Sequence, residues 1–168
     1  MSIPLPEWAS HIFSSSLTVA TLVAFILNLF FRLGISQKAT LVLSRDLDVG
    51  AEIYRFLENH GATWGARHQV IHEAKHILRE LVEALFIYNI TNKPVQVEAL
   101  FDEFNLNMHV TYKGKPIDFP RNPPSEKEMM NDKTALVKMS GFMIQFMADN
   151  VTVRKNSDFY KVDIHVMH

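Results

Sequence analysis

Near its start the chain carries a run of uncharged, mostly apolar residues from Ile12 to Phe31. A helix of this length, rising about 1.5 Å per residue, covers the roughly 30 Å of hydrocarbon in a bilayer. A buried helix of a soluble protein is the alternative, but it would normally show a polar face, which this run lacks. We therefore expect one transmembrane helix. Asn28 favours contact with neighbouring helices, because an unpaired amide is costly in lipid.

The charges that flank this run predict its orientation. Arg32, Lys38 and Arg45 follow it, whereas Glu7 precedes it. Since basic residues stay on the cytoplasmic side, we expect a single span of the cell inner (plasma) membrane with a cytoplasmic C-terminal domain. A cleaved signal peptide is the other interpretation, but it would need basic residues before the run and small residues after it.

Beyond a junction at 34–48, the apolar spacing becomes that of amphipathic helices. The pattern predicts a helix over 49–60, with Gly61 as its left-handed cap, and a longer helix over 66–88 with one apolar face. A third helix is predicted over 134–149. Its large apolar residues are predicted to belong to the core; they are Met139, Phe142, Met143, Phe146 and Met147.

Four segments alternate apolar and polar residues or are rich in β-branched residues, which predicts strands at 95–101, 105–112, 151–155 and 159–167. The turn residues at 156–158 join the last two into a hairpin, and a polar loop covers 113–133. We therefore predict an α+β fold in two layers, with helices on one face of a mostly antiparallel sheet. The expected domains are 1–40, a terminal transmembrane helix with its flanks, and 41–168, an α+β domain.

Composition narrows the function classes. The chain has 168 residues with 17 basic and 18 acidic side chains, so it lacks the basic excess that nucleic acid attracts. It has no cysteine, which excludes disulfides and thiolate metal sites. The balanced charge and the absence of cysteine are best explained by a cytosolic domain that does not bind nucleic acid.

One motif has the residues of a zinc peptidase. His72, Glu73 and His76 form the HExxH pattern, in which two imidazoles one helical turn apart bind zinc and the glutamate activates a water molecule. The two histidines lie opposite the apolar face of the predicted helix, so we expect them to face solvent. A zinc peptidase is therefore kept as a remote alternative.

The N-terminal part resembles a transporter family. The sequence of residues 3–34, IPLPEWASHIFSSSLTVATLVAFILNLFFRLG, is similar to the last transmembrane helix of bacterial xanthine/uracil permeases of the nucleobase:cation symporter-2 family. The resemblance implies that this is the C-terminal piece of a symporter for purines or pyrimidines. The implied partners are the lipid bilayer, the remaining transmembrane helices and a second copy of the chain. The family's substrate-binding residues lie on earlier helices, so none is carried over here.

The C-terminal part, from about residue 66, resembles the ATP-binding fold of histidine kinases, gyrase, Hsp90 and MutL, especially anti-sigma-factor kinases. Glu80 stands where the family has its general base, but Ala84 replaces the asparagine that holds magnesium. Gly114 keeps a family glycine, while Tyr112 replaces the aspartate that binds adenine. Gly141 matches the glycine that opens the helix after the lid. The resemblance thus implies a degenerate site, with no ATP or magnesium expected as cofactor.

Together these features predict a transport protein and not an enzyme. The expected function is the C-terminal portion of a purine or pyrimidine transporter, whose cytosolic domain is a non-catalytic regulatory or interaction module. The alternative is a membrane-tethered, kinase-like regulator that binds a nucleotide at Glu80, Gly114 and Gly141.

Overall fold

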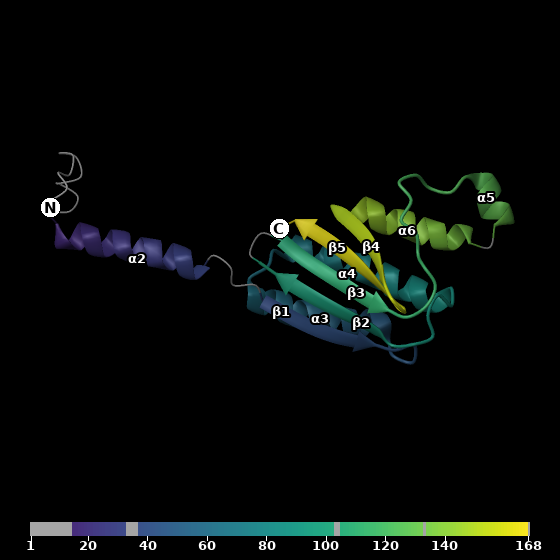
Figure 1. The fold of residues 1–168 in the computed structure, drawn as a ribbon, viewed down its shortest axis with the longest axis horizontal. Helices are drawn as coiled ribbons and strands as arrows, with labels where there is room; N and C mark the ends of the chain where they lie inside the picture. Colours follow the sequence, from purple (N-terminus) through teal and green to yellow (C-terminus); the bar gives the residue numbers. More distant parts are fainter. Residues whose placement is uncertain (1–14, 33–36, 103–104, 133, 168) are drawn as a thin grey trace. The chain divides into compact units, whose positions relative to one another are not determined.

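The structure is a computed structural model that describes residues 15–32, 37–102, 105–132 and 134–167. It contains two compact units, Met1–Ile35 and Ser36–His168 (Figure 1).

The first unit contains the helix α2 (Ser16–Arg32). Large apolar side chains are exposed along it: Leu17, Leu22, Val23, Phe25, Ile26 and Leu27. Within the ranges above, no helix is both long enough and apolar enough to cross a membrane. The transmembrane helix expected over 12–31 is therefore not supported, because the described helix begins only at Ser16. Residues 12–14 of that expectation lie outside the described ranges.

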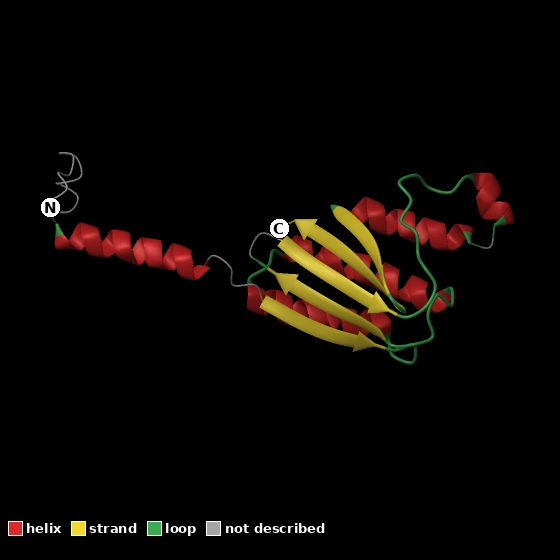
Figure 2. Cartoon of the chain, viewed as in Figure 1, coloured by secondary structure: helices red, strands yellow, loops and turns green. Residues whose placement is uncertain are grey.

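The second unit has the predicted α+β architecture, with helices on one face of a five-stranded antiparallel sheet (Figure 2). The strand order is β1-β2-β3-β5-β4, and every neighbouring pair is antiparallel. Along the chain the elements are β1 (Gln37–Leu43), α3 (Val49–Trp64), α4 (His68–Ile87), β2 (Val95–Phe101), β3 (Asn105–Tyr112), α5 (Glu126–Asn131), α6 (Ala135–Met147), β4 (Asn150–Asn156) and β5 (Phe159–Met167).

The core lies between the sheet and the helices. Alternate residues of β2, β3 and β5 are buried, and the residues between them lie on the open face of the sheet. From α4, Leu78, Leu81 and Leu85 have no exposed surface. Burying a leucine side chain stabilises the fold by about 2 kcal/mol, so α4 anchors the helical layer.

Two elements were missed by the sequence pattern. β1 lies within the stretch interpreted as a junction, and it pairs with β2 at one edge of the sheet. As an edge strand it exposes Val42 and only half buries Leu41, so its alternation is weak. α5 lies inside the predicted loop, where Ser125 and Glu128 form a capping box that starts the helix.

The predicted glycine cap of α3 is wrong. Gly61 lies inside α3 and is buried, and a Cβ atom there would approach Ile71 Cδ1 to 2.6 Å. The helix continues to Trp64, and Gly65 takes the left-handed conformation with φ of 69°. Gly61 therefore serves the close packing of α3 on α4.

Candidate functional site

Glu80, the first of the three residues predicted to bind a nucleotide, lies on α4. Glu80 is half-buried, and Ala84 is only 3% exposed. α4 contacts α3 and also α6. The position where the resembled family has its magnesium-holding asparagine is therefore closed to solvent, and its methyl group offers no ligand atom.

Gly114 lies against the chain that follows α4. A Cβ atom at Gly114 would fall 2.1 Å from the carbonyl oxygen of Ile90. That oxygen accepts a hydrogen bond from the Lys115 amide at 3.0 Å. Next to it, the buried Thr91 hydroxyl donates to the carbonyl oxygen of Lys113 at 2.8 Å. Gly114 therefore permits two backbone segments to approach closely.

Gly141 has the same role on another element. It lies in the interior of α6, so the prediction that it opens this helix is wrong, since α6 begins at Ala135. A Cβ atom at Gly141 would lie 2.0 Å from the carbonyl oxygen of Asp118 and 3.4 Å from Pro120. The chain around buried Ile117 thus covers α6 at the position where the resemblance implied nucleotide contact.

A cavity of about 340 Å³ lies close to these glycines. Its lining comes from the end of α4, the segment after β3 and the start of α6: Tyr88, Ile90, Lys115, Pro116, Asp118, Thr134, Val137 and Lys138. The Lys138 ammonium lies 3.1 Å from Asp132 and 3.6 Å from Glu128. Hydrogen bonds from Thr134, with a contribution from Lys138, lower the pKa of Asp132 to about 2. Acidic partners therefore already offset the Lys138 charge at neutral pH.

The HExxH residues lie on the surface of α4. The Nε2 atoms of His72 and His76 are 3.2 Å apart, and both side chains are exposed. The Glu73 carboxylate accepts a hydrogen bond from Gln69 at 2.9 Å. In the part of the chain that the structure describes, no group of three or more histidine, aspartate or glutamate residues could hold a metal ion. The two imidazoles are thus paired in solvent and not placed in a closed cleft.

Beside them lies a smaller cavity of about 180 Å³, which His72 and His76 line together with Lys75. The Lys75 ammonium lies 4.0 Å from the centre of the Tyr54 ring and forms an ion pair with Glu58. This lysine connects α3 and α4, and its charge opposes binding of a metal cation in the same cavity.

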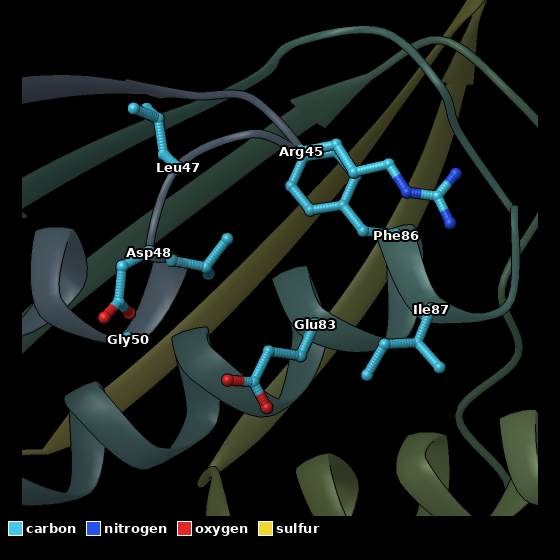
Figure 3. Close-up of a pocket in the computed structure, with 8 residues that line it drawn as sticks. Arg45, Leu47, Asp48, Gly50, Glu83, Phe86 and Ile87 are labelled. Atoms are coloured by element: carbon cyan, nitrogen blue, oxygen red, sulfur yellow. The ribbon is translucent and has the colours of Figure 1, made fainter.

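The largest of these cavities, about 450 Å³, lies where the β1–α3 connection meets the end of α4 (Figure 3). Figure 3 shows Arg45 and Leu47 contributed by the connection, and Glu83, Phe86 and Ile87 contributed by α4. The Arg45 guanidinium donates to the Asn89 side chain at 2.8 Å. An open cavity with apolar walls, one cation and two carboxylates, Asp48 and Glu83, suits a protein side chain better than a phosphate.

A polar network that the sequence did not reveal lies on the open face of the sheet. The strand register aligns Glu98, His109, Asp163 and Thr152 in one row across β2, β3, β5 and β4. His109 Nδ1 is 2.5 Å from Asp163, and Arg154 Nε donates to the same carboxylate at 2.8 Å. Burial opposes the charge on Asp163, but these hydrogen bonds outweigh it and lower the pKa of that carboxyl.

The same face carries two further contacts. His165 Nδ1 lies 2.7 Å from the Asn107 side chain, and a hydrogen bond from Lys38 lowers the pKa of Glu98. Only the sheet register brings these residues together, because they are dispersed along the sequence. The face is a charged surface whose polar groups pair mainly with one another.

Comparison with models of known protein families and with curated proteins finds no match to this chain.

Proposed function

We propose that the chain is the C-terminal portion of a membrane transporter for purines or pyrimidines, and that residues 37–167 form its non-catalytic regulatory or interaction module. The permease-like sequence of residues 3–34 supports the proposal that the chain belongs to a transporter. The exposed apolar side chains of α2 support it further, because such a helix needs other apolar helices or lipid to cover it. The same proposal places the module on the cytoplasmic side of the inner membrane.

The observation that best supports a non-catalytic module is the packing of the chain around Asp118 onto α6 at Gly141. A phosphate needs backbone amides or cations that are free to point at it. Here a carbonyl oxygen lies over the glycine instead, and it would repel a phosphate oxygen. Ala84 and Tyr112 also lack the groups that would hold magnesium and adenine.

The cavity between Arg45 and Glu83 supports the interaction role. The side chains of Leu47 and Ile87 at this cavity are exposed, although both are apolar. Exposed apolar residues surrounded by charged ones are typical of surfaces that contact another protein.

Binding of a fluorescent ATP analogue with magnesium to the full chain tests the non-catalytic part. We expect no saturable binding at concentrations on the order of tens of micromolar. Saturable, magnesium-dependent binding at those concentrations would contradict the proposal.

A nucleotide-binding regulator is the second candidate, because the 340 Å³ cavity holds two lysines beside an aromatic ring. It predicts binding that is lost in Lys115→Ala, since Lys115 lines that cavity, and kept in the control Lys155→Ala on β4. That pair of results would replace the first candidate with the second.

Sequencing the genomic DNA upstream of Met1 tests the transporter part separately. A continuous reading frame that encodes further hydrophobic segments is expected. A stop codon and a ribosome-binding site directly before Met1 would contradict the transporter assignment without affecting the result of the nucleotide titration.

A further inference from the structure

α6 exposes apolar residues that were expected in the core. Its inward side is formed by Ala135, Ser140, Gly141 and Ile144. The outward side carries Leu136, Met139, Met143 and Phe146, whose spacing of three and four residues makes a continuous stripe. Leu136 is 51% exposed, Met143 40% and Phe146 77%. Figure 1 shows α6 at the margin of the second unit, next to β4.

α5, which contacts α6, also exposes two methionines. Met129 is 41% exposed and Met130 is 85% exposed. At on the order of 200 Å² for each large apolar side chain, the exposed parts of these five residues amount to about 600 Å². A standard protein interface buries about 800 Å² on each partner, and an open apolar patch on a monomer rarely exceeds about 600 Å². The partly buried Met139 and Phe142 add a smaller exposed area.

We infer that this stripe, Leu136, Met139, Met143 and Phe146, is the contact surface for α6 of a second copy of the chain, with the two helices antiparallel. The pattern matches itself when reversed: Leu136 meets Phe146 of the second copy, and Met139 meets Met143. Such self-complementarity is what a two-fold interface requires. An antiparallel pair also places the helix dipoles in opposite directions, which is favourable.

Electrostatics permits this pairing. From Ala135 to Met147 the helix carries one charged residue, Lys138, and its partners Asp132 and Glu128 belong to the same copy. Two stripes therefore meet without repulsion between like charges. A lipid surface fits less well, because helices that lie on membranes are rich in basic residues, whereas α6 has one lysine and α5 carries charges of both signs.

Cysteine cross-linking of the full chain tests the geometry, because the natural sequence has no cysteine. Leu136→Cys and Phe146→Cys chains, co-expressed and mildly oxidised, should form a disulfide-linked dimer. Leu136→Cys alone should not, because ten residues of helix separate the two ends by about 15 Å, beyond the reach of a disulfide. Tyr54→Cys, on the exposed side of α3, is the control for random collision.

Two cross-linking results would overturn the inference. One is a Leu136/Phe146 mixture that forms no more dimer than Tyr54→Cys. The other is equal dimer formation by Leu136→Cys alone. Association through the apolar helix α2 would not align positions 136 and 146, so it cannot imitate the expected result.

Sedimentation velocity gives a second readout. Phe146→Glu should weaken association at least tenfold, whereas Tyr54→Glu should leave it unchanged. Both side chains are largely exposed, so neither substitution removes a buried group, and circular dichroism checks that the fold is kept. Unchanged association of Phe146→Glu would overturn the inference.

Discussion

Substituting Gly141 by alanine should destabilise the protein, although general helix propensity predicts the opposite. Gly141 lies in the interior of α6, where alanine is favoured over glycine by about 1 kcal/mol. The new methyl group would lie 2.0 Å from the carbonyl oxygen of Asp118 and 3.1 Å from its carbon. The sign of the change depends on which of these two effects is larger.

The overlap is the larger effect. A carbon and a carbonyl oxygen approach one another to about 3.3 Å, so the Asp118 carbonyl has to retreat by roughly 1.3 Å. The atom belongs to the backbone, and the same segment carries Ile117, which is only 2% exposed. Overpacking of this kind costs about 1–3 kcal/mol, and displacing Ile117 favours the upper end. After subtraction of the helix gain, a net loss of about 2 kcal/mol is expected.

Urea unfolding followed by far-UV circular dichroism measures this loss. Gly50→Ala is the matched control, because Gly50 also lies in a helix but its Cβ would have ordinary contacts, 3.5 Å to Asp48 and 3.6 Å to Arg79. The control should be neutral or slightly more stable than the natural chain. If Gly141→Ala is as stable as Gly50→Ala, the carbonyl does not cover α6, and the main support for a non-catalytic module is lost.

Two further predictions follow from polar contacts. Thr91→Val removes a buried hydroxyl that donates to Lys113 and accepts from the Lys93 amide, so urea unfolding should show a loss of about 1–3 kcal/mol, and an unchanged midpoint would contradict this. Because the pKa of Asp163 is lowered in the folded state, its stabilisation is present above the unfolded value of about 3.9 and disappears as the pH falls through the folded value. The stability difference between the natural chain and Asp163→Asn should therefore shrink as the pH falls below about 4; a difference that stays constant into this acidic range would refute the contribution of the charge.

The elements of the second unit could largely be predicted from the sequence. The bounds of β2, β3 and β5 are those predicted, because each strand buries one face and exposes the other, which imposes a period of two. β1 could not be recognised, since an edge strand buries fewer side chains and leaves a weaker pattern. The sequence contains the capping box of α5 at Ser125 and Glu128, but α5 was not predicted because no apolar run follows this motif.

The candidate sites were less predictable, because they depend on contacts between distant segments. His109 and Asp163 are 54 residues apart, and only the pairing of β3 with β5 places them 2.5 Å from each other. The roles of Gly114 and Gly141 were assigned from a resemblance, whereas the structure uses both for close backbone packing. A glycine in a sequence indicates freedom to approach, but not which segment approaches it.

The sequence by itself determined most of the helices and strands of the second unit, the absence of thiolate chemistry, and the balance of charge. These properties depend on local spacing and on composition, which need no knowledge of the fold. Only the tertiary structure decided that the carbonyl of Asp118 covers Gly141 and that the apolar stripe of α6 faces outward. The physical reason is that an apolar helix face looks the same in the sequence whether it meets its own core or another molecule.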